Sequence, residues 1–210
     1  QPRRCWSDTS VKRTPDSDRG AQAFGNDSSW ANWRMKKSKV IILGEDAAHC
    51  SIVREFLKER GYSHRQIRSL PVPGRGGSGE AYVRKEFPKY LTAIRSRQNI
   101  GLITIIDADA VDYQQRVEQL RCQCQENGID WRTAEESAVI AVPARNIETW
   151  FVYLTSEGEW SEEKDEWKRK KNKLARPAAR SLHRMCYNDQ RLREPSPPSL
   201  RQACEEWKRM

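Results

Sequence analysis

The run Leu-Ile-Thr-Ile-Ile-Asp-Ala-Asp at residues 102–109 constrains the fold of this chain more than any other segment. A run of this length that is apolar apart from Thr104 is typical of a strand that is buried on both faces of a parallel sheet. It ends in two carboxylates, Asp107 and Asp109, and a second such strand, residues 40–43, ends directly before Gly-Glu, whose glutamate is Glu45. Ligands of open parallel sheets bind at the carboxyl ends of the strands. The pattern therefore predicts one acidic cluster at that edge.

Segments with the spacing of amphipathic helices lie between these strands and two further apolar runs. We expect strands at residues 40–43, 66–72, 101–106 and 138–142, and helices at residues 47–60, 80–96, 111–126 and 147–154. Strands that alternate with helices are joined by crossover connections and form parallel sheets. The sequence thus predicts an α/β fold with a mainly parallel four-stranded sheet flanked by helices.

Changes in composition suggest three parts of the chain. Residues 1–34 are rich in Ser, Asp, Arg, Gly and Asn without apolar periodicity, and we expect a flexible N-terminal extension. Residues 35–155 contain the strand and helix pattern of the α/β domain. Residues 156–210 are expected to form a basic helical C-terminal appendage, in which Ser199 caps the last helix.

Charge and cysteine content limit the partners and the compartment. The 210 residues carry a net charge of +9, which permits an acidic partner such as nucleic acid. No apolar stretch approaches the length of a membrane span, so we expect no membrane partner. Among the six cysteines only Cys122 and Cys124 are close, and their spacing suits neither common zinc sites nor a redox pair. A cytoplasmic protein with reduced cysteines is expected.

Two interpretations apply to the acids that follow the strands. Mg²⁺ and Mn²⁺ prefer oxygen ligands, and Glu45, Asp107 and Asp109 would supply carboxylates for such an ion. Alternatively, Asp46 or Asp109 accepts hydrogen bonds from the free N–H groups of the following helix. We favour the cap for Asp46. For the other three acids we favour a metal site, since clustered carboxylates are costly without a cation.

The order of these motifs resembles the TOPRIM domain of topoisomerases, primases and overcoming-lysogenization-defect nucleases. The resemblance covers about residues 39–142 and looks closest to small stand-alone TOPRIM-like proteins of bacterial defence loci. It implies a Rossmann-like topology, with the family's glutamate at Glu45 and its Asp-x-Asp pair at Asp107 and Asp109, where they would bind Mg²⁺ for phosphodiester chemistry. Many nuclease-type members carry another acid shortly after the glutamate, and His49 stands near that position here.

The segment Pro-Ala-Arg-Asn-Ile-Glu-Thr-Trp at residues 143–150 follows the last expected strand. Glu148 is a candidate catalytic residue and Arg145 a candidate phosphate contact, because both would lie at the carboxyl edge of the sheet. A structural interpretation is equally open. In it, Asn146 caps a helix, the charge of Glu148 interacts favourably with the positive N-terminal end of that helix, and Trp150 is buried in the core. The two interpretations are compatible.

Further basic residues are candidate contacts for nucleic acid. The glycine-rich loop at residues 73–79 carries Arg75, which would face a phosphate, although a plain flexible loop is the simpler explanation. The basic segment at residues 164–184 is either a nucleic-acid surface or a solvated helix face. We favour the surface, and the candidate residues within it are Lys168, Arg169, Lys170 and Lys171.

These expectations combine into two hypotheses about function. The first is a Mg²⁺- or Mn²⁺-dependent nuclease, or a related phosphoryl-transfer enzyme, that acts on nucleic acid in defence against phage or mobile DNA. The second is a non-catalytic TOPRIM-like binding module of a larger defence or DNA-processing complex. The chain has no ATPase motif, so a partner protein such as an ATPase encoded nearby is expected in either case.

Overall fold

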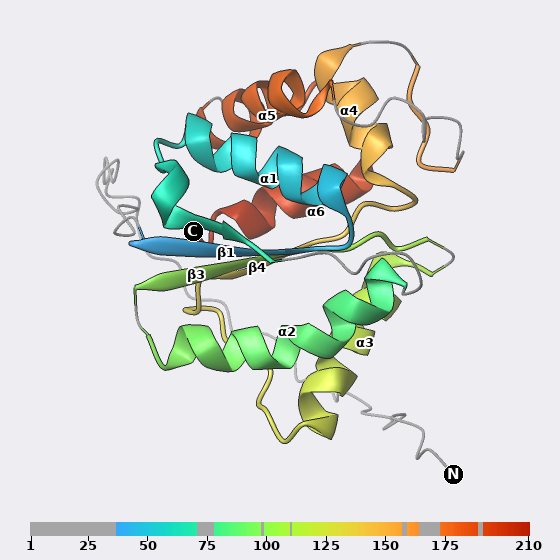
Figure 1. Cartoon of the computed structure of the whole chain (residues 1–210). Coiled ribbons are helices and arrows are strands. Elements are labelled where there is room, and N and C mark those ends of the chain that lie inside the picture. Colours follow the sequence, from blue (N-terminus) through green and yellow to red (C-terminus); the bar gives the residue numbers. More distant parts are fainter. Residues whose placement is uncertain are drawn as a thin grey trace, which may run out of the picture. The chain divides into compact units, whose positions relative to one another are not determined.

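The structure is a computed structural model that describes residues 37–70, 78–97, 99–109, 111–156, 159–163, 173–188 and 191–210. Within them, one sheet is built from β1 (Lys39–Gly44), β2 (Ile67–Ser69), β3 (Ile100–Ile105) and β4 (Ala138–Ala141). The strands are all parallel, and their spatial order is β2-β1-β3-β4 (Figure 1). The predicted α/β fold with a parallel four-stranded sheet is confirmed.

Helices connect the strands and continue after the last of them. They are α1 (Ala47–Glu59), α2 (Gly79–Arg95), α3 (Tyr113–Glu126), α4 (Ile147–Thr155), α5 (Ala175–His183) and α6 (Pro198–Trp207), with the short turns η1 (His64–Gln66) and η2 (Arg184–Asn188), the latter a π-helix. α1 to α4 correspond to the four expected helices. β2 is shorter than expected over the residues that the structure describes.

The two faces of the sheet support two cores. Successive strand residues point to opposite sides. Ile103 and Ile105 of β3 accordingly join the core that α1, α4, α5 and α6 cover, whereas Leu102 joins the core that α2 and α3 cover (Figure 1). Burial on both faces explains why β1, β3 and β4 are almost continuously apolar in the sequence, whereas the edge strand β2 is not.

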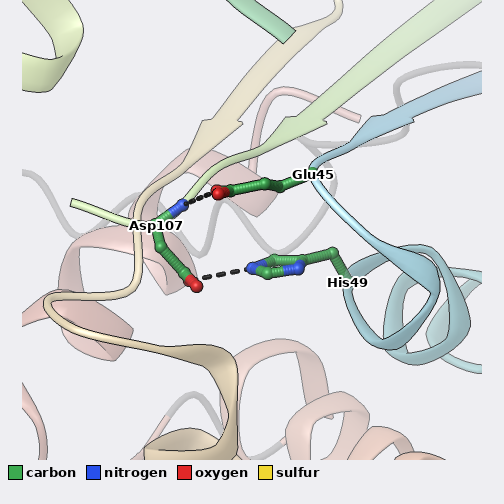
Figure 2. A group of neighbouring side chains, drawn as sticks. All are labelled: Glu45, His49 and Asp107. Carbon is green, nitrogen blue, oxygen red and sulfur yellow. Dashed lines mark hydrogen bonds and ion pairs between the residues drawn. The ribbon is translucent and has the colours of Figure 1, made fainter. Parts of the chain in front are cut away.

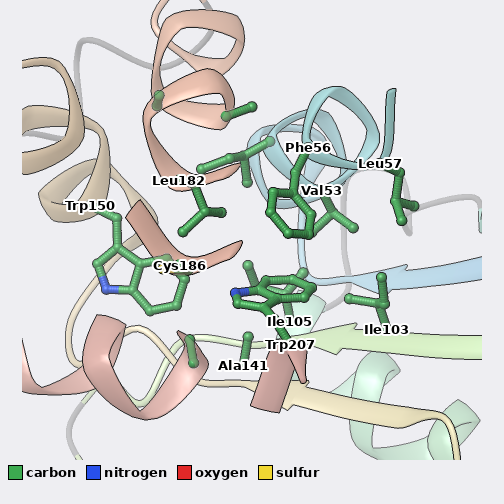
Figure 3. Close-up of a cluster of buried hydrophobic side chains, with 14 of the residues drawn as sticks. Val53, Phe56, Leu57, Ile103, Ile105, Ala141, Trp150, Leu182, Cys186 and Trp207 are labelled. Atoms are coloured by element: carbon green, nitrogen blue, oxygen red, sulfur yellow. The ribbon is translucent and has the colours of Figure 1, made fainter. Parts of the chain in front are cut away.

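The segment after α4 contributes directly to the first core. Trp207 of α6 lies against Phe56 of α1, with 4.8 Å between the ring centroids, and Leu182 of α5 is buried beside them (Figure 3). Trp150 is buried as expected, and its Nε1–H donates a hydrogen bond to Ser199 Oγ over 2.8 Å. Ser199 is therefore engaged in the core. The expectation that it caps the last helix is wrong, because α6 begins after Pro197 without a side-chain cap.

The cysteines differ from expectation at one place. Cys186 of η2 and Cys204 of α6 form a disulfide, with 5.1 Å between their Cα atoms. The expectation of reduced cysteines is wrong for this pair, while Cys50, Cys122 and Cys124 form no disulfide within the described part of the chain. None of the helices in the described ranges has the length and apolarity needed to cross a membrane.

Candidate metal centre

The register of the sheet brings the first two predicted acids together. Gly44, the last residue of β1, pairs with Ile105, the last residue of β3. Because the two strands are parallel neighbours, Glu45 and Asp107 leave the sheet side by side. The backbone N–H of Asp107 donates a hydrogen bond to Glu45 Oε2 over 2.9 Å. The predicted convergence of these two acids at the carboxyl edge is confirmed.

The start of α1 adds a histidine to this pair. Asp46 caps the helix as expected, and its Oδ1 accepts hydrogen bonds from the backbone N–H groups of Ala48 at 2.7 Å and His49 at 3.0 Å. His49 is 1% exposed. Its Nδ1 lies 2.8 Å from Asp46 Oδ1, and its Nε2 lies 2.8 Å from Asp107 Oδ1. Figure 2 shows His49 and Glu45 both directed toward Asp107.

Three side chains therefore form a candidate metal centre. One ligand atom each from Glu45, His49 and Asp107 lies within 4.8 Å of the other two. Two carboxylates and one imidazole are a common donor set for divalent first-row metals, and the carboxylates alone are sufficient for Mg²⁺ with water as further ligands. Asp46 would orient the imidazole from behind, as carboxylates do in many metal sites.

The electrostatics of the cluster favour added positive charge. Burial and the neighbouring charge of Asp107 raise the pKa of Glu45 to about 7. Burial also raises the pKa of Asp107, despite the opposing effect of His49. The pKa of His49 is raised well above its usual value, because the charges of Asp107 and Asp46 outweigh the opposing effect of burial. The cluster thus retains protons that a bound cation would displace.

Asp109, the third predicted ligand, is not part of this group. It is exposed, and its φ of 55° turns the chain out of the extended path of β3. Its charge still contributes to the raised pKa values of Glu45 and Asp107, so it lies near them. The structure therefore gathers two of the three predicted acids with His49 and leaves Asp109 at the border of the site.

The segment after β4 follows its structural interpretation closely. Asn146 caps α4 by accepting a hydrogen bond from the Thr149 N–H over 3.2 Å, as expected. Glu148 is buried in the first turn of this helix, and Arg145 is exposed in the loop before it. Neither belongs to the group of ligand atoms found within the described residues. The catalytic role of Glu148 and the phosphate contact of Arg145 stay predictions.

The other predicted contacts to nucleic acid lie elsewhere in the chain. Arg75 of the glycine-rich loop and the basic residues Lys168, Arg169, Lys170 and Lys171 fall outside the described residues.

Arg116 supports the turn between the two aspartates and was not expected from the sequence. It is 4% exposed, and its Nη2–H donates to the carbonyl oxygen of Ala108 over 2.9 Å. Its Nη1 forms an ion pair with Glu80 in the first turn of α2. Arg116 thus ties α2 and α3 to the backbone between Asp107 and Asp109. A signal was available: Arg116, Leu120 and Cys124 recur at the spacing of one buried helix face.

Gly79 brings α2 against the site. A Cβ atom at this position would lie 2.3 Å from the carbonyl oxygen of Glu45 and 2.6 Å from its Cγ, which is closer than real contacts allow. The absence of a side chain therefore lets the start of α2 pack directly on Glu45. Nothing in the sequence distinguishes Gly79 from the glycines that precede it at positions 74, 76 and 77.

Comparison with other proteins adds no family assignment. No protein-family model, curated protein or solved structure matches this chain.

Proposed function

We propose that this protein is a divalent-metal-dependent phosphoryl-transfer enzyme of TOPRIM-like type that cleaves nucleic acid. The observation that carries the proposal is the convergence of Glu45, His49 and Asp107 at the carboxyl edge of a parallel sheet. Ligands of such sheets bind at that edge. Acids held together there need a cation to offset their repulsion.

The residues fit Mg²⁺ or Mn²⁺. Glu45 and Asp107 would be the carboxylate ligands, and Asp109 at the border of the site would bind a water molecule of the coordination shell or a second ion. The metal would orient a water molecule and offset the charge that develops on the phosphoryl oxygens. Mn²⁺ accepts nitrogen ligands more readily than Mg²⁺, so His49 favours Mn²⁺ as the tighter of the two.

Asp46 gives His49 a defined orientation for this role. When Nδ1–H donates to Asp46, Nε2 is left to face Asp107 and the site between them. The neutral imidazole would ligate the metal through Nε2, whereas the protonated imidazole would donate its Nε2 proton to the leaving oxygen. Both roles require the ring position that the Asp46 contact holds.

One observation favours the second hypothesis, a non-catalytic module. His49 already bridges Asp46 and Asp107, so the cluster carries an internal cation when the imidazole is protonated. A cluster that is neutralised in this way would have a purely structural role. The chain would then act as a binding subunit of a larger assembly, with a partner such as an ATPase.

The proposed substrate and the defence role imply a cytoplasmic location. The disulfide between Cys186 and Cys204 is the one observation against it, because the cytosol keeps most thiols reduced. Counting free thiols in protein that is denatured directly after purification from cytosol would decide the state of this pair.

A cleavage assay tests the enzyme hypothesis. Purified protein is incubated with single- and double-stranded DNA and RNA, with Mg²⁺, Mn²⁺ or a chelator. We expect cleavage only with metal, and we expect Asp107→Asn to abolish it. Asp130→Asn is the matched control, because it makes the same chemical change at an exposed position on the loop after α3. Absence of cleavage by the unaltered protein on all substrates would leave the binding module as the better account.

A further inference from the structure

A row of basic residues begins in the turn before α5 and continues along the outer face of α5 and η2. Lys173, Arg176, Arg180 and Arg184 are exposed, and Tyr187 follows them. These five positions are separated by three, four, four and three residues, which is the spacing of one helix face. Residues 173–188 contain no Asp or Glu. We refer to this row of five residues as the α5 stripe.

The buried face of α5 shows which way the side chains of the α5 stripe point. Ala175, Ala178, Ala179 and Leu182 are buried, and they belong to the core that α5 shares with α1. In Figure 1, α5 lies beside α1 on the side of the sheet away from α2. The stripe therefore faces away from the core.

Few acids offset the charge of the stripe. Within the described part of the chain, the ion pair of Arg180 with Glu59, at 3.2 Å, is the one recorded for these residues. Glu55 of α1 is itself paired with Lys58 at 2.6 Å. His183 adds no charge near neutral pH, since burial and the neighbouring Arg60 lower its pKa. Among the described residues of this surface, the basic side chains outnumber the acidic ones.

Tyr187 ends the stripe with an exposed aromatic ring. It is the one large hydrophobic side chain recorded as exposed among the described residues, at 48%. The Arg60 guanidinium lies 4.4 Å from the ring centroid, and the His183 ring lies 5.2 Å away at an interplanar angle of 30°. These contacts hold the ring in place, while the residue as a whole stays about half exposed.

We infer that the α5 stripe binds single-stranded nucleic acid, with the basic residues on successive phosphates and Tyr187 stacked on a base. Cations in a row along a helix complement a polyanion, and base stacking on an aromatic ring tolerates any sequence. An unpaired base is required, because a base inside a duplex presents no free face to Tyr187.

The stripe is connected to the candidate metal centre through α1. Arg176 lines a surface groove with Ser51 and Glu55, which follow His49 by two and six residues, and Arg180 contacts Glu59 near the end of the same helix. α5 therefore runs parallel to α1, and the stripe begins on the side of the metal centre. The inference rests on the proposed function, because that function identifies the polyanion as a nucleic acid substrate.

Binding is measured by fluorescence anisotropy with a labelled oligonucleotide in a chelator, so that no metal chemistry contributes. The variant with Arg176→Gln, Arg180→Gln and Arg184→Gln should bind at least tenfold more weakly. Its slope of log affinity against log salt should be smaller by about 2, since each lost phosphate contact to a single strand removes about 0.7. Tyr187→Ala should weaken binding roughly 5- to 150-fold, whereas Tyr187→Phe should retain it.

A matched control removes the same charge from the other side of the sheet. Lys85→Gln, Lys89→Gln and Arg97→Gln change exposed residues on or beside α2, so the net charge falls equally. This variant should bind like the unaltered protein. Equal losses in both triple variants would show attraction by net charge alone and would overturn the inference, as would unaltered binding by the α5 variant.

The substrates and the metal separate this inference from the proposed function. DNA and RNA strands of the same sequence identify the preferred sugar, and tighter binding of a duplex than of either strand would contradict the role of Tyr187. Suppose the α5 variant binds nucleic acid as tightly as the control variant, while Asp107→Asn still abolishes metal-dependent cleavage. Only the inference about the α5 stripe is then wrong. If the stripe binds nucleic acid and no variant affects cleavage, the metal centre is wrong instead.

Discussion

Glu45 holds its carboxyl group in surroundings that disfavour its charge. Its pKa is raised from 4.5 to about 7 by burial and by Asp107. Between these two values the folded state binds more protons than the unfolded state, so rising pH removes stability through this group. A glutamine at this position keeps an acceptor for the Asp107 N–H and has no proton to lose.

The variant Glu45→Gln therefore tests the electrostatics of the site without metal. In a chelator, its melting temperature should equal that of the unaltered protein at about pH 5 and exceed it at about pH 8. Added Mn²⁺ should stabilise the unaltered protein at the higher pH and leave the variant unchanged. Scanning calorimetry measures both effects, and a difference in melting temperature that does not depend on pH would contradict the raised pKa.

At Gly79, the absence of a Cβ atom allows α2 to pack closely on Glu45. Gly79→Ala should reduce stability by about 1–3 kcal/mol, because the added methyl group must displace Glu45. It should also weaken Mn²⁺ binding in a calorimetric titration. Gly128→Ala is the control: its φ of 67° makes alanine unfavourable by about 1–2 kcal/mol, but its side-chain position is open and distant from the metal centre. Unchanged Mn²⁺ affinity in Gly79→Ala would show that α2 does not position Glu45.

At the scale of elements, Arg116 joins α3, α2 and the turn between the two aspartates. Lysine keeps the charge but lacks the planar fork that bonds the Ala108 carbonyl and Glu80 together. Arg116→Lys should therefore lower the Mn²⁺ affinity roughly tenfold, as for other residues that orient metal ligands. Arg121→Lys on the exposed side of α3 should leave it unchanged. Equal affinities for the two variants would make Arg116 a purely structural residue.

The elements also explain what the sequence predicts and what it does not. The strands, the Asp46 and Asn146 caps and the pairing of Glu45 with Asp107 depend on local pattern and on the rules of parallel sheets, so they were predictable. The hydrogen bond between His49 and Asp107 joins residues that are 58 positions apart in the sequence. A local sequence pattern does not reveal such a contact. Ser199 resembles a cap in the sequence, yet Trp150 engages its hydroxyl from a distant helix.

At the scale of the whole molecule, both cores are built from residues of one compact unit, Lys36–Met210. A chain that begins at Met35 should therefore melt within a few degrees of the full chain and bind Mn²⁺ with the same affinity. Thermal melts and calorimetry on the two chains provide the comparison. A large loss of melting temperature would show that the first 34 residues contribute to folding.

The hydrophobic core depends on the C-terminal helices as well as on the sheet. α5 and α6 supply Leu182 and Trp207 to the core that also buries Phe56 of α1, and α1 carries His49 into the metal centre. The α5 stripe and the metal centre are thus attached to the same helix. Substrate binding and chemistry are expected to belong to one folded unit.

We expect Glu45, His49 and Asp107 to bind a divalent cation, and a calorimetric titration with Mn²⁺ measures this binding. Asp107→Asn replaces one carboxylate oxygen in a side chain of nearly equal shape, so a melt should first show that the fold is retained. The unaltered protein should bind Mn²⁺ saturably, Asp107→Asn should lose this binding, and Asp130→Asn should bind normally. Equal Mn²⁺ affinity in the unaltered protein and Asp107→Asn, or no binding by either, would contradict this expectation.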